Sequence, residues 1–86
     1  MNRIERIKKI LEYNFKPESL VLYDNSSKHA GHNNFDGSGM THLQLKIKSI
    51  KFKDKKLLET HNMVNTVLKK EFEKGLHSLE IKIINY

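Results

Sequence analysis

The stretch "THLQLKI", residues 41–47, alternates strictly between polar and apolar side chains. Leu43, Leu45 and Ile47 fall on one side of an extended chain, and the polar side chains between them fall on the other. This period of two predicts a half-buried β-strand. A strand with one apolar face requires a sheet whose face is covered by other elements.

The segments before this strand predict a helix and another strand. Apolar residues recur at helical spacing near the N-terminus, at Ile4, Ile7, Leu11 and Phe15. Asn2 followed by Glu5 resembles a capping box at the start of this helix, and Pro17 ends it. Residues 19–24, "SLVLYD", are rich in strand-forming residues, so they are expected to form the first strand.

The segments after residues 41–47 predict a long helix and a final strand. The alternation slips at Ser49-Ile50, which indicates a bulge or turn before the polar connection 51–56. A helical stripe then runs to Gly75, in a helix that is expected to break once. Its members are Leu57, His61, Val64, Leu68 and Phe72. In residues 77–83 the alternation returns and predicts the third strand.

This order of elements defines the expected fold class. Helix, strand, strand, helix and strand predict one α+β domain over residues 1–86, with helices covering one face of a three-stranded sheet. No apolar run approaches the roughly 20 residues that span a bilayer, and no signal peptide is visible. We therefore expect a cytoplasmic protein that does not bind membranes.

Composition restricts the chemistry. The chain has no cysteine, so a metal must be held through His, Asp or Glu, or through sulfur from a partner. A formal net charge of +6 favours an acidic partner without choosing one. No nucleophile motif, glycine-rich phosphate loop or paired carboxylates stand out. We expect no enzymatic activity.

Three of the five histidines lie in or beside a glycine-bearing loop at residues 25–40. His29 and His32 have a spacing at which two imidazoles can approach one metal, but spacing alone favours solvated side chains over ligands. His42 is expected on the outward face of its strand, as a surface residue near the loop. His61 lies on the helical apolar stripe, where a hydrogen-bonded core residue is the favoured interpretation.

His77 stands directly before the last alternating residues, after the glycine that ends the long helix. This places the imidazole at the end of a sheet, partly exposed, where functional side chains commonly gather. The pattern alone leaves a metal ligand and a structural residue equally open.

Lysines are densest between residues 46 and 56, and Asp54 alone opposes them. The candidates for phosphate contact are Lys51, Lys53, Lys55 and Lys56. A solvated face is the commoner meaning of such a run, and Phe52 is the only aromatic residue within it. The G-x-x-G loop of a KH-type RNA module is missing.

Three stretches together resemble the BolA family: "LVLYDNSSKHAGH", "THLQLKI" and "LLETHNMVNTVLKKEFEKGLHSLEIKI". The specific features are a histidine-bearing loop before a Thr-His strand start, a His-x-x-Val in the long helix, and Gly-x-His-x-Leu at the final strand. The resemblance implies a fold similar to a class II KH domain without the G-x-x-G loop. The chain departs from the family at Phe52-Lys53-Asp54 and at residues 61–64, which lack a usual glycine and arginine.

The resemblance also implies a function. BolA-like proteins partner with monothiol glutaredoxins, and the pair holds a [2Fe-2S] cluster used in iron-sulfur trafficking or iron sensing. Glutaredoxin and glutathione would supply thiolates, and this chain would supply His77, with His29 as the second ligand carried over and His32 or His42 as alternatives. Alone, the chain is expected to be a monomer or weak homodimer.

Some BolA-like proteins are transcriptional regulators of cell shape and stress. The alternative function is therefore a DNA-binding regulator that uses the lysine-rich segment 46–56 and the long helix.

Overall fold

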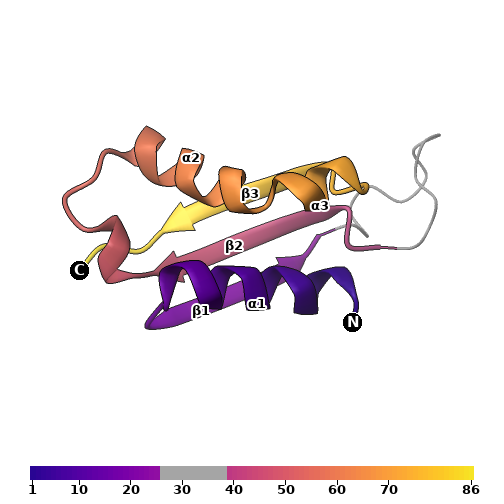
Figure 1. Ribbon diagram of the computed structural model, residues 1–86, viewed down its shortest axis with the longest axis horizontal. Coiled ribbons are helices and arrows are strands. Elements are labelled where there is room, and N and C mark those ends of the chain that lie inside the picture. The colour runs from indigo at the N-terminus through magenta and orange to yellow at the C-terminus, as the bar shows by residue number, and fades with distance from the viewer. Residues whose placement is uncertain (26–38) are drawn as a thin grey trace.

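The computed structural model describes residues 1–25 and 39–86. The elements follow the expected order (Figure 1): α1 (Arg3–Phe15), β1 (Ser19–Asp24), β2 (His42–Lys48), the 3-10 turn η2 (Ile50–Phe52), α2 (Leu57–Val67), α3 (Lys69–Glu73) and β3 (Ser78–Ile83). The predicted break of the long helix is confirmed, since α2 and α3 are separated at Leu68. The predicted turn near Ile50 is confirmed as η2.

The sheet has the order β1-β2-β3, with β2 at its centre. β1 pairs with β2 antiparallel, and Leu22 lies opposite Leu45. β2 pairs with β3 parallel, and His42 lies opposite Ser78. Parallel strands must be joined by a crossover, which α2 and α3 provide here. As a result, β2 and β3 begin at the same edge of the sheet (Figure 1).

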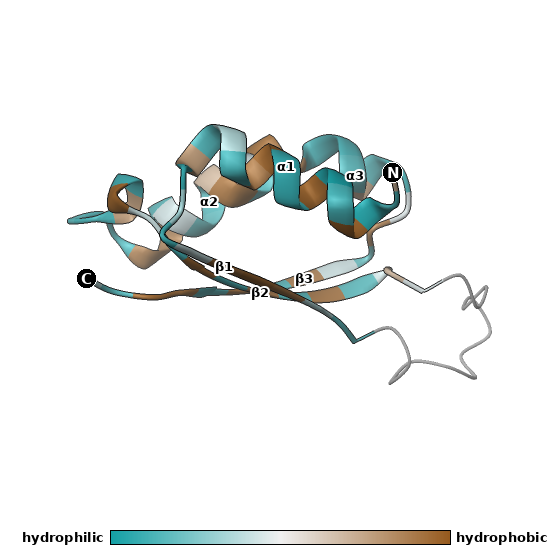
Figure 2. Ribbon diagram, turned by 90° about the horizontal axis from the view of Figure 1, so that it is seen from below, coloured by the Kyte–Doolittle hydropathy of each residue, from teal (hydrophilic) through white to brown (hydrophobic). Residues whose placement is uncertain are grey.

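The helices lie on one face of the sheet and leave its other face uncovered (Figure 2). The covered face carries Leu43, Leu45 and Ile47, which are all buried, as the alternation predicts. The other members of the buried apolar core are Ile7, Leu11, Phe15, Phe52, Val64, Leu68 and Leu76. The predicted fold class, helices over one face of a three-stranded α+β sheet, is confirmed.

Local hydrogen bonds fix both ends of α1. The Asn2 side chain accepts a hydrogen bond of 2.9 Å from the backbone N–H of Glu5, so the predicted N-cap is confirmed. The helix ends at Lys16, which adopts a left-handed conformation (φ 43°) directly before Pro17. This cap turns the chain from α1 into β1.

Three expectations about side chains need correction. Leu57 is 64% exposed, because it is the first residue of α2 and the buried stripe of that helix begins at Thr60. Phe52 is buried, with its ring centroid 4.8 Å from that of Phe15, so it offers no stacking surface to a nucleic acid. His61 is half-buried, but its Nε2 has no hydrogen-bond partner among the described residues.

Within the described part of the chain, no helix combines the length and apolar character needed to cross a membrane.

Candidate functional site

Two histidines meet where β2 and β3 begin. The backbone N–H of His77 donates a hydrogen bond of 2.8 Å to the carbonyl of Thr41, the residue before β2. This bond extends the parallel ladder by one step and brings the His77 and His42 rings together. The ring centroids are 5.5 Å apart and the planes are nearly perpendicular, at 89°. We call this edge of the sheet, with His42, His77 and the residues that hold them, the histidine end.

His42 is the more enclosed of the two rings. It is half-buried, and its Nδ1 lies 2.9 Å from the hydroxyl of Thr41, whose side chain is itself buried. A hydrogen bond to one ring nitrogen fixes the orientation of an imidazole. His42 lies on the outward face of its strand beside the loop, as predicted, but it is half-buried, because the parallel pairing of β2 with β3 places its ring against His77.

His77 is exposed, as its position at the end of the sheet predicts. It follows the tight turn that leads from α3 into β3. Gly75 adopts φ 114°, and the backbone N–H of Leu76 donates a hydrogen bond of 3.0 Å to the carbonyl of Glu71. Leu76 is buried in the core. The backbone of His77 is thus fixed by its hydrogen bond to Thr41 and by the preceding turn, while its imidazole is exposed to solvent.

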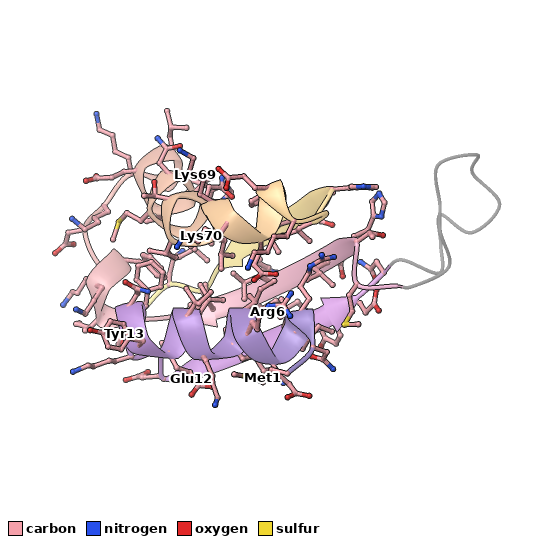
Figure 3. All side chains as sticks on the ribbon, turned by 45° about the vertical axis from the view of Figure 1, so that its right-hand side comes forward. Met1, Arg6, Glu12, Tyr13, Lys69 and Lys70 are labelled. Carbon is pink, nitrogen blue, oxygen red and sulfur yellow. The ribbon has the colours of Figure 1, made fainter. Side chains whose placement is uncertain are left out.

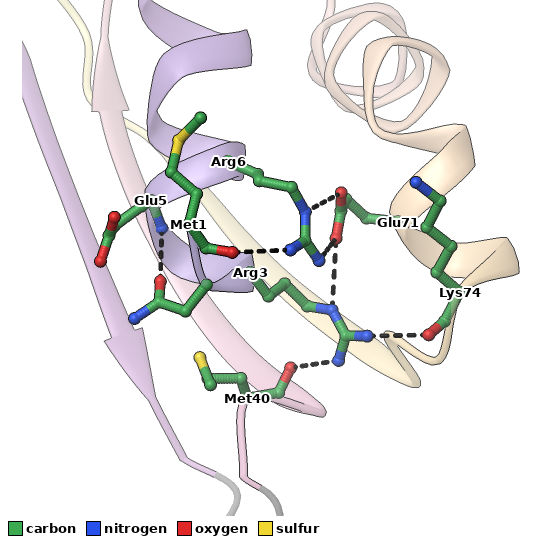
Figure 4. Close-up of polar contacts among 8 residues, drawn as sticks. Met1, Arg3, Glu5, Arg6, Met40, Glu71 and Lys74 are labelled. Carbon is green, nitrogen blue, oxygen red and sulfur yellow. Dashed lines mark hydrogen bonds and ion pairs between the residues drawn. The ribbon is translucent and has the colours of Figure 1, made fainter.

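Beneath this turn, one carboxylate joins α3 to α1 (Figure 4). Glu71 is 3% exposed and receives hydrogen bonds from two arginines on the first turns of α1. Arg6 donates from both Nε and Nη2, at 2.9 Å each, in a bidentate arrangement. Arg3 donates from Nε at 3.3 Å. The Arg6 hydrogen bond is the main reason that the pKa of Glu71 lies below its ordinary value, despite burial.

Arg3 extends this network to the histidine end. Its Nη1 donates to the carbonyl of Met40 at 3.0 Å, and its Nη2 donates to the carbonyl of Lys74 at 2.8 Å. The backbone N–H of Met40 in turn donates to the carboxylate of Asp24 at 3.1 Å. One guanidinium therefore ties together α1, the end of α3 and the residue that leads into β2.

The ends of the histidine-bearing loop are described, whereas its centre is not. The backbone N–H of Asn25 donates a hydrogen bond of 2.7 Å to the carbonyl of His42, so one end of the loop lies beside the paired rings. The other end, at Gly39 and Met40, is held by Asp24 and Arg3. His29 and His32 belong to residues 26–38 and lie outside the described residues.

The two paired rings at this end, His42 and His77, offer nitrogen donors. In residues 1–25 and 39–86, no group of three or more His, Cys, Asp or Glu side chains is arranged to hold a metal ion. A [2Fe-2S] cluster takes four protein or cofactor ligands, and histidine can replace thiolate on one iron. An exposed imidazole with a second imidazole beside it fits part of such a ligand set, and thiolates must then come from a partner.

The four candidate lysines, Lys51, Lys53, Lys55 and Lys56, are exposed at the opposite end of the sheet, on η2 and the segment before α2. Lys46 and Lys48 lie on the uncovered face of β2, over the rings of Tyr23 and Tyr86 at 5.7 and 4.7 Å from their centroids, and Tyr86 also lines a hollow with Lys53 and Lys55. The lysine-dense segment is thus divided between two elements.

Sequence reasoning missed the pairing of His42 with His77. The signal that can find it is topological, since a strand that follows a crossover helix pairs in parallel and begins at the same edge. It also missed the Glu71 network, for which the only sequence signal is the i, i+3 spacing of Arg3 and Arg6.

Comparisons with known proteins show the family and the fold. The family model described as "BolA-like protein" matches residues 11–85. An uncharacterized protein from the cobS 5' region of Sinorhizobium is 36% identical over 83 residues, 95% of this chain and 89% of that protein. The chloroplastic BOLA1 of Arabidopsis thaliana is 37% identical over 82 residues, which cover 93% of this chain and 51% of that protein.

A solved structure has the same fold. The BolA domain of SufE1 from Arabidopsis thaliana superposes with a TM-score of 0.85 at 34% identity, and the match covers 99% of this chain and 94% of that domain.

Proposed function

The chain belongs to the BolA-like protein family, and from this premise we propose that it is a non-enzymatic adaptor that binds a monothiol glutaredoxin and shares its [2Fe-2S] cluster. The observation that carries the proposal is the pair of imidazoles at the histidine end, in a chain with no cysteine. The cluster would serve iron-sulfur trafficking or iron sensing.

His77 is the first ligand in this proposal. It is exposed, so a partner can reach its imidazole, and its backbone is fixed by the Thr41 hydrogen bond and the Gly75 turn. Imidazole ligation of one iron, with thiolates from glutaredoxin and glutathione, would raise the reduction potential of the cluster above that of all-thiolate ligation. The second ligand is His29, His32 or His42, and His42 is the one whose ring lies beside His77.

The adaptor role has a further support. The solved BolA domain of SufE1 is, by its description, one domain of another protein. A domain that occurs joined to another protein is compatible with a module that works beside a partner, and the choice of function rests on the site rather than on the fold.

The test uses purified chain combined anaerobically with a monothiol glutaredoxin, glutathione, iron and sulfide. Visible circular dichroism is compared for wild type, His77→Ala and His77→Cys. The proposal predicts a spectrum that differs from that of the glutaredoxin alone, that is lost with His77→Ala, and that reappears in altered form with His77→Cys because a thiolate can replace the imidazole.

Stability provides the control. Because His77 is exposed, His77→Ala is expected to change the free energy of unfolding by no more than about 0.5 kcal/mol. Spectra that match glutaredoxin alone for all three proteins would contradict the proposal.

The alternative is a DNA-binding regulator, favoured by the four exposed lysines around η2. If these side chains contact phosphates, the affinity for duplex DNA should fall by orders of magnitude between about 50 and 200 mM salt. Substituting Lys51, Lys53, Lys55 and Lys56 with Gln should reduce the slope of log affinity against log salt by about four, and His77→Ala should leave it unchanged.

A further inference from the structure

An open groove lies between the end of α1 and the exposed side of α2. Its volume is about 600 Å³, and the apolar side chains that line it are Phe15, Leu58, Met63 and Val67. Phe15 and Val67 belong to elements whose other side chains form the core, so the groove is supported by rigid packing. The end of α1 and the start of α2 lie at the end of the sheet opposite the start of β2 (Figure 1).

Large apolar side chains continue beyond the groove. Leu58 is 73% exposed, Leu57 beside it is also exposed, and Tyr13 on the last turns of α1 is 82% exposed. Figure 3 places Tyr13 at the far end of α1 from Arg6. A groove lined by apolar side chains, with the exposed Leu57 and Leu58 on the helix that forms it, marks an interaction site more often than a solvated face. We call the groove and these flanking residues the groove end.

The charge beside the groove is positive. Lys56 lines it directly, and the one lining carboxylate, Glu59, lies 3.7 Å from the Lys55 ammonium and is neutralised by it. Lys51 and Lys53 are exposed on η2 and the segment before α2, and Lys53 lines a second hollow, with Asp54 and Tyr86, rather than the groove. An occupant therefore needs apolar side chains for the floor and negative charge for the rim.

We propose that the groove end binds an amphipathic helix of another protein, with an apolar stripe and acidic flanks. A helix is convex and presents side chains at i, i+3, i+4 and i+7, which match an elongated apolar groove. The lysines complement glutamate or aspartate beside that stripe. This proposal stands on the groove alone and does not depend on the cluster.

Other occupants fit less well. A second copy of the chain carries a net charge of +6 and the same lysine rim, so a symmetric contact would place like charges together. A flat bilayer reaches the protruding Leu57 and Leu58 but not the floor at Phe15 and Met63. Phosphates of a nucleic acid would satisfy Lys56 and leave the apolar floor without a partner.

The probe is a synthetic helical peptide of about 16 residues, long enough to form a helix, with leucines on one stripe and glutamates elsewhere. Two matched peptides serve as controls: an isomer of the same composition with the leucines distributed around the helix, and a version with lysine in place of glutamate. Binding to isotope-labelled full chain is followed by amide NMR shifts. The acidic striped peptide is expected to bind at least about tenfold more tightly than either control, with shifts around Met63 and Val67.

Two exposed apolar residues provide matched variants. Leu58→Ser should weaken binding of the acidic peptide by about tenfold. Val21→Ser, on the uncovered face of β1, should leave it unchanged. In the double variant Lys55→Glu/Lys56→Glu, the lysine peptide should bind more tightly than the acidic peptide, which reverses the order of affinities seen with wild type. Both single variants should keep the melting temperature of wild type, because neither side chain is buried.

Four outcomes would overturn the proposal. The first is equal binding of the striped and distributed peptides, and the second is a set of NMR shifts confined to other surfaces. The third is failure of the acidic peptide to bind, together with binding of duplex DNA or anionic phosphatidylserine vesicles that Leu58→Ser abolishes. The fourth is self-association in analytical ultracentrifugation that Leu58→Ser abolishes. Each is independent of the His77 spectra, so this proposal and the cluster proposal can fail separately.

Discussion

The two ends of the sheet are built in opposite ways. At the histidine end, buried charge and backbone hydrogen bonds hold α1, α3 and the start of β2 in one arrangement, and His77 presents an exposed imidazole. At the groove end, the helices leave leucines and a tyrosine in solvent, with lysines around them. The comparison teaches that one end holds its backbone in a fixed arrangement, and the other offers apolar area.

The first prediction concerns stability and has the largest effect. Glu71→Ala leaves Arg3 and Arg6 without their shared acceptor, so the free energy of unfolding should fall by about 2–3 kcal/mol in urea titrations. Leu58→Ser at the groove end should stay within about 0.5 kcal/mol of wild type, since the side chain is exposed. Equal losses of unfolding free energy for the two substitutions would contradict the difference between the histidine end and the groove end.

The carboxylate of Glu71 should make the free energy of unfolding depend on pH in the acidic range. Because the arginines lower the pKa of Glu71 in the folded state, its contribution is fully present above the unfolded pKa of about 4.3 and is lost as pH falls through the folded pKa. Unfolding of wild type and Glu71→Gln is compared from neutral pH downward. The difference should be constant near neutrality and shrink below about pH 4; a difference independent of pH down to about 2 would contradict the assignment.

Gly75→Ala tests the turn beneath His77. A side chain at φ 114° is strained, and its Cβ would lie 3.3 Å from Nη2 of Arg3. We expect a loss of about 1–3 kcal/mol by urea unfolding, together with weakened dichroism of the shared cluster. Ser78→Ala, at an exposed neighbouring position, is the control and should change neither measurement.

His61→Leu is expected to have the smallest effect on stability. His61 lies on α2 but is not among the residues that line the groove. The buried Nε2 has no partner among the described residues, so its replacement by an apolar side chain should raise the free energy of unfolding by up to about 1 kcal/mol. His61→Gln, which keeps a polar atom there, should bring no gain. Destabilisation by Leu as large as that by Gln would show that the nitrogen has a partner in solution.

Local pattern was sufficient for the fold. The alternation at Leu43, Leu45 and Ile47 and the spacing of Ile7 and Leu11 both report burial on one face, and these residues form the core. Pattern failed for Leu57, because helical spacing alone does not say at which turn a helix first meets the sheet.

The candidate site was predicted only in part. The exposure of His77 follows from its place before a strand, whereas its contact with His42 depends on which strands pair and in which direction. Strand pairing and strand direction are properties of the tertiary structure, which a local sequence pattern does not report. The contacts of Glu71 with Arg3 and Arg6 span more than 60 residues of sequence, and no local pattern encodes them.

The most direct test of the central claim is pulsed EPR on the reduced cluster, formed between unlabelled glutaredoxin and this chain carrying ¹⁵N-labelled histidine. Ligation by this chain predicts a ¹⁵N coupling of directly bound imidazole in wild type, and the component of that coupling that comes from His77 is lost in His77→Ala. A cluster that forms with both proteins and shows no ¹⁵N coupling in wild type would contradict the assignment of the histidine end as a ligand site.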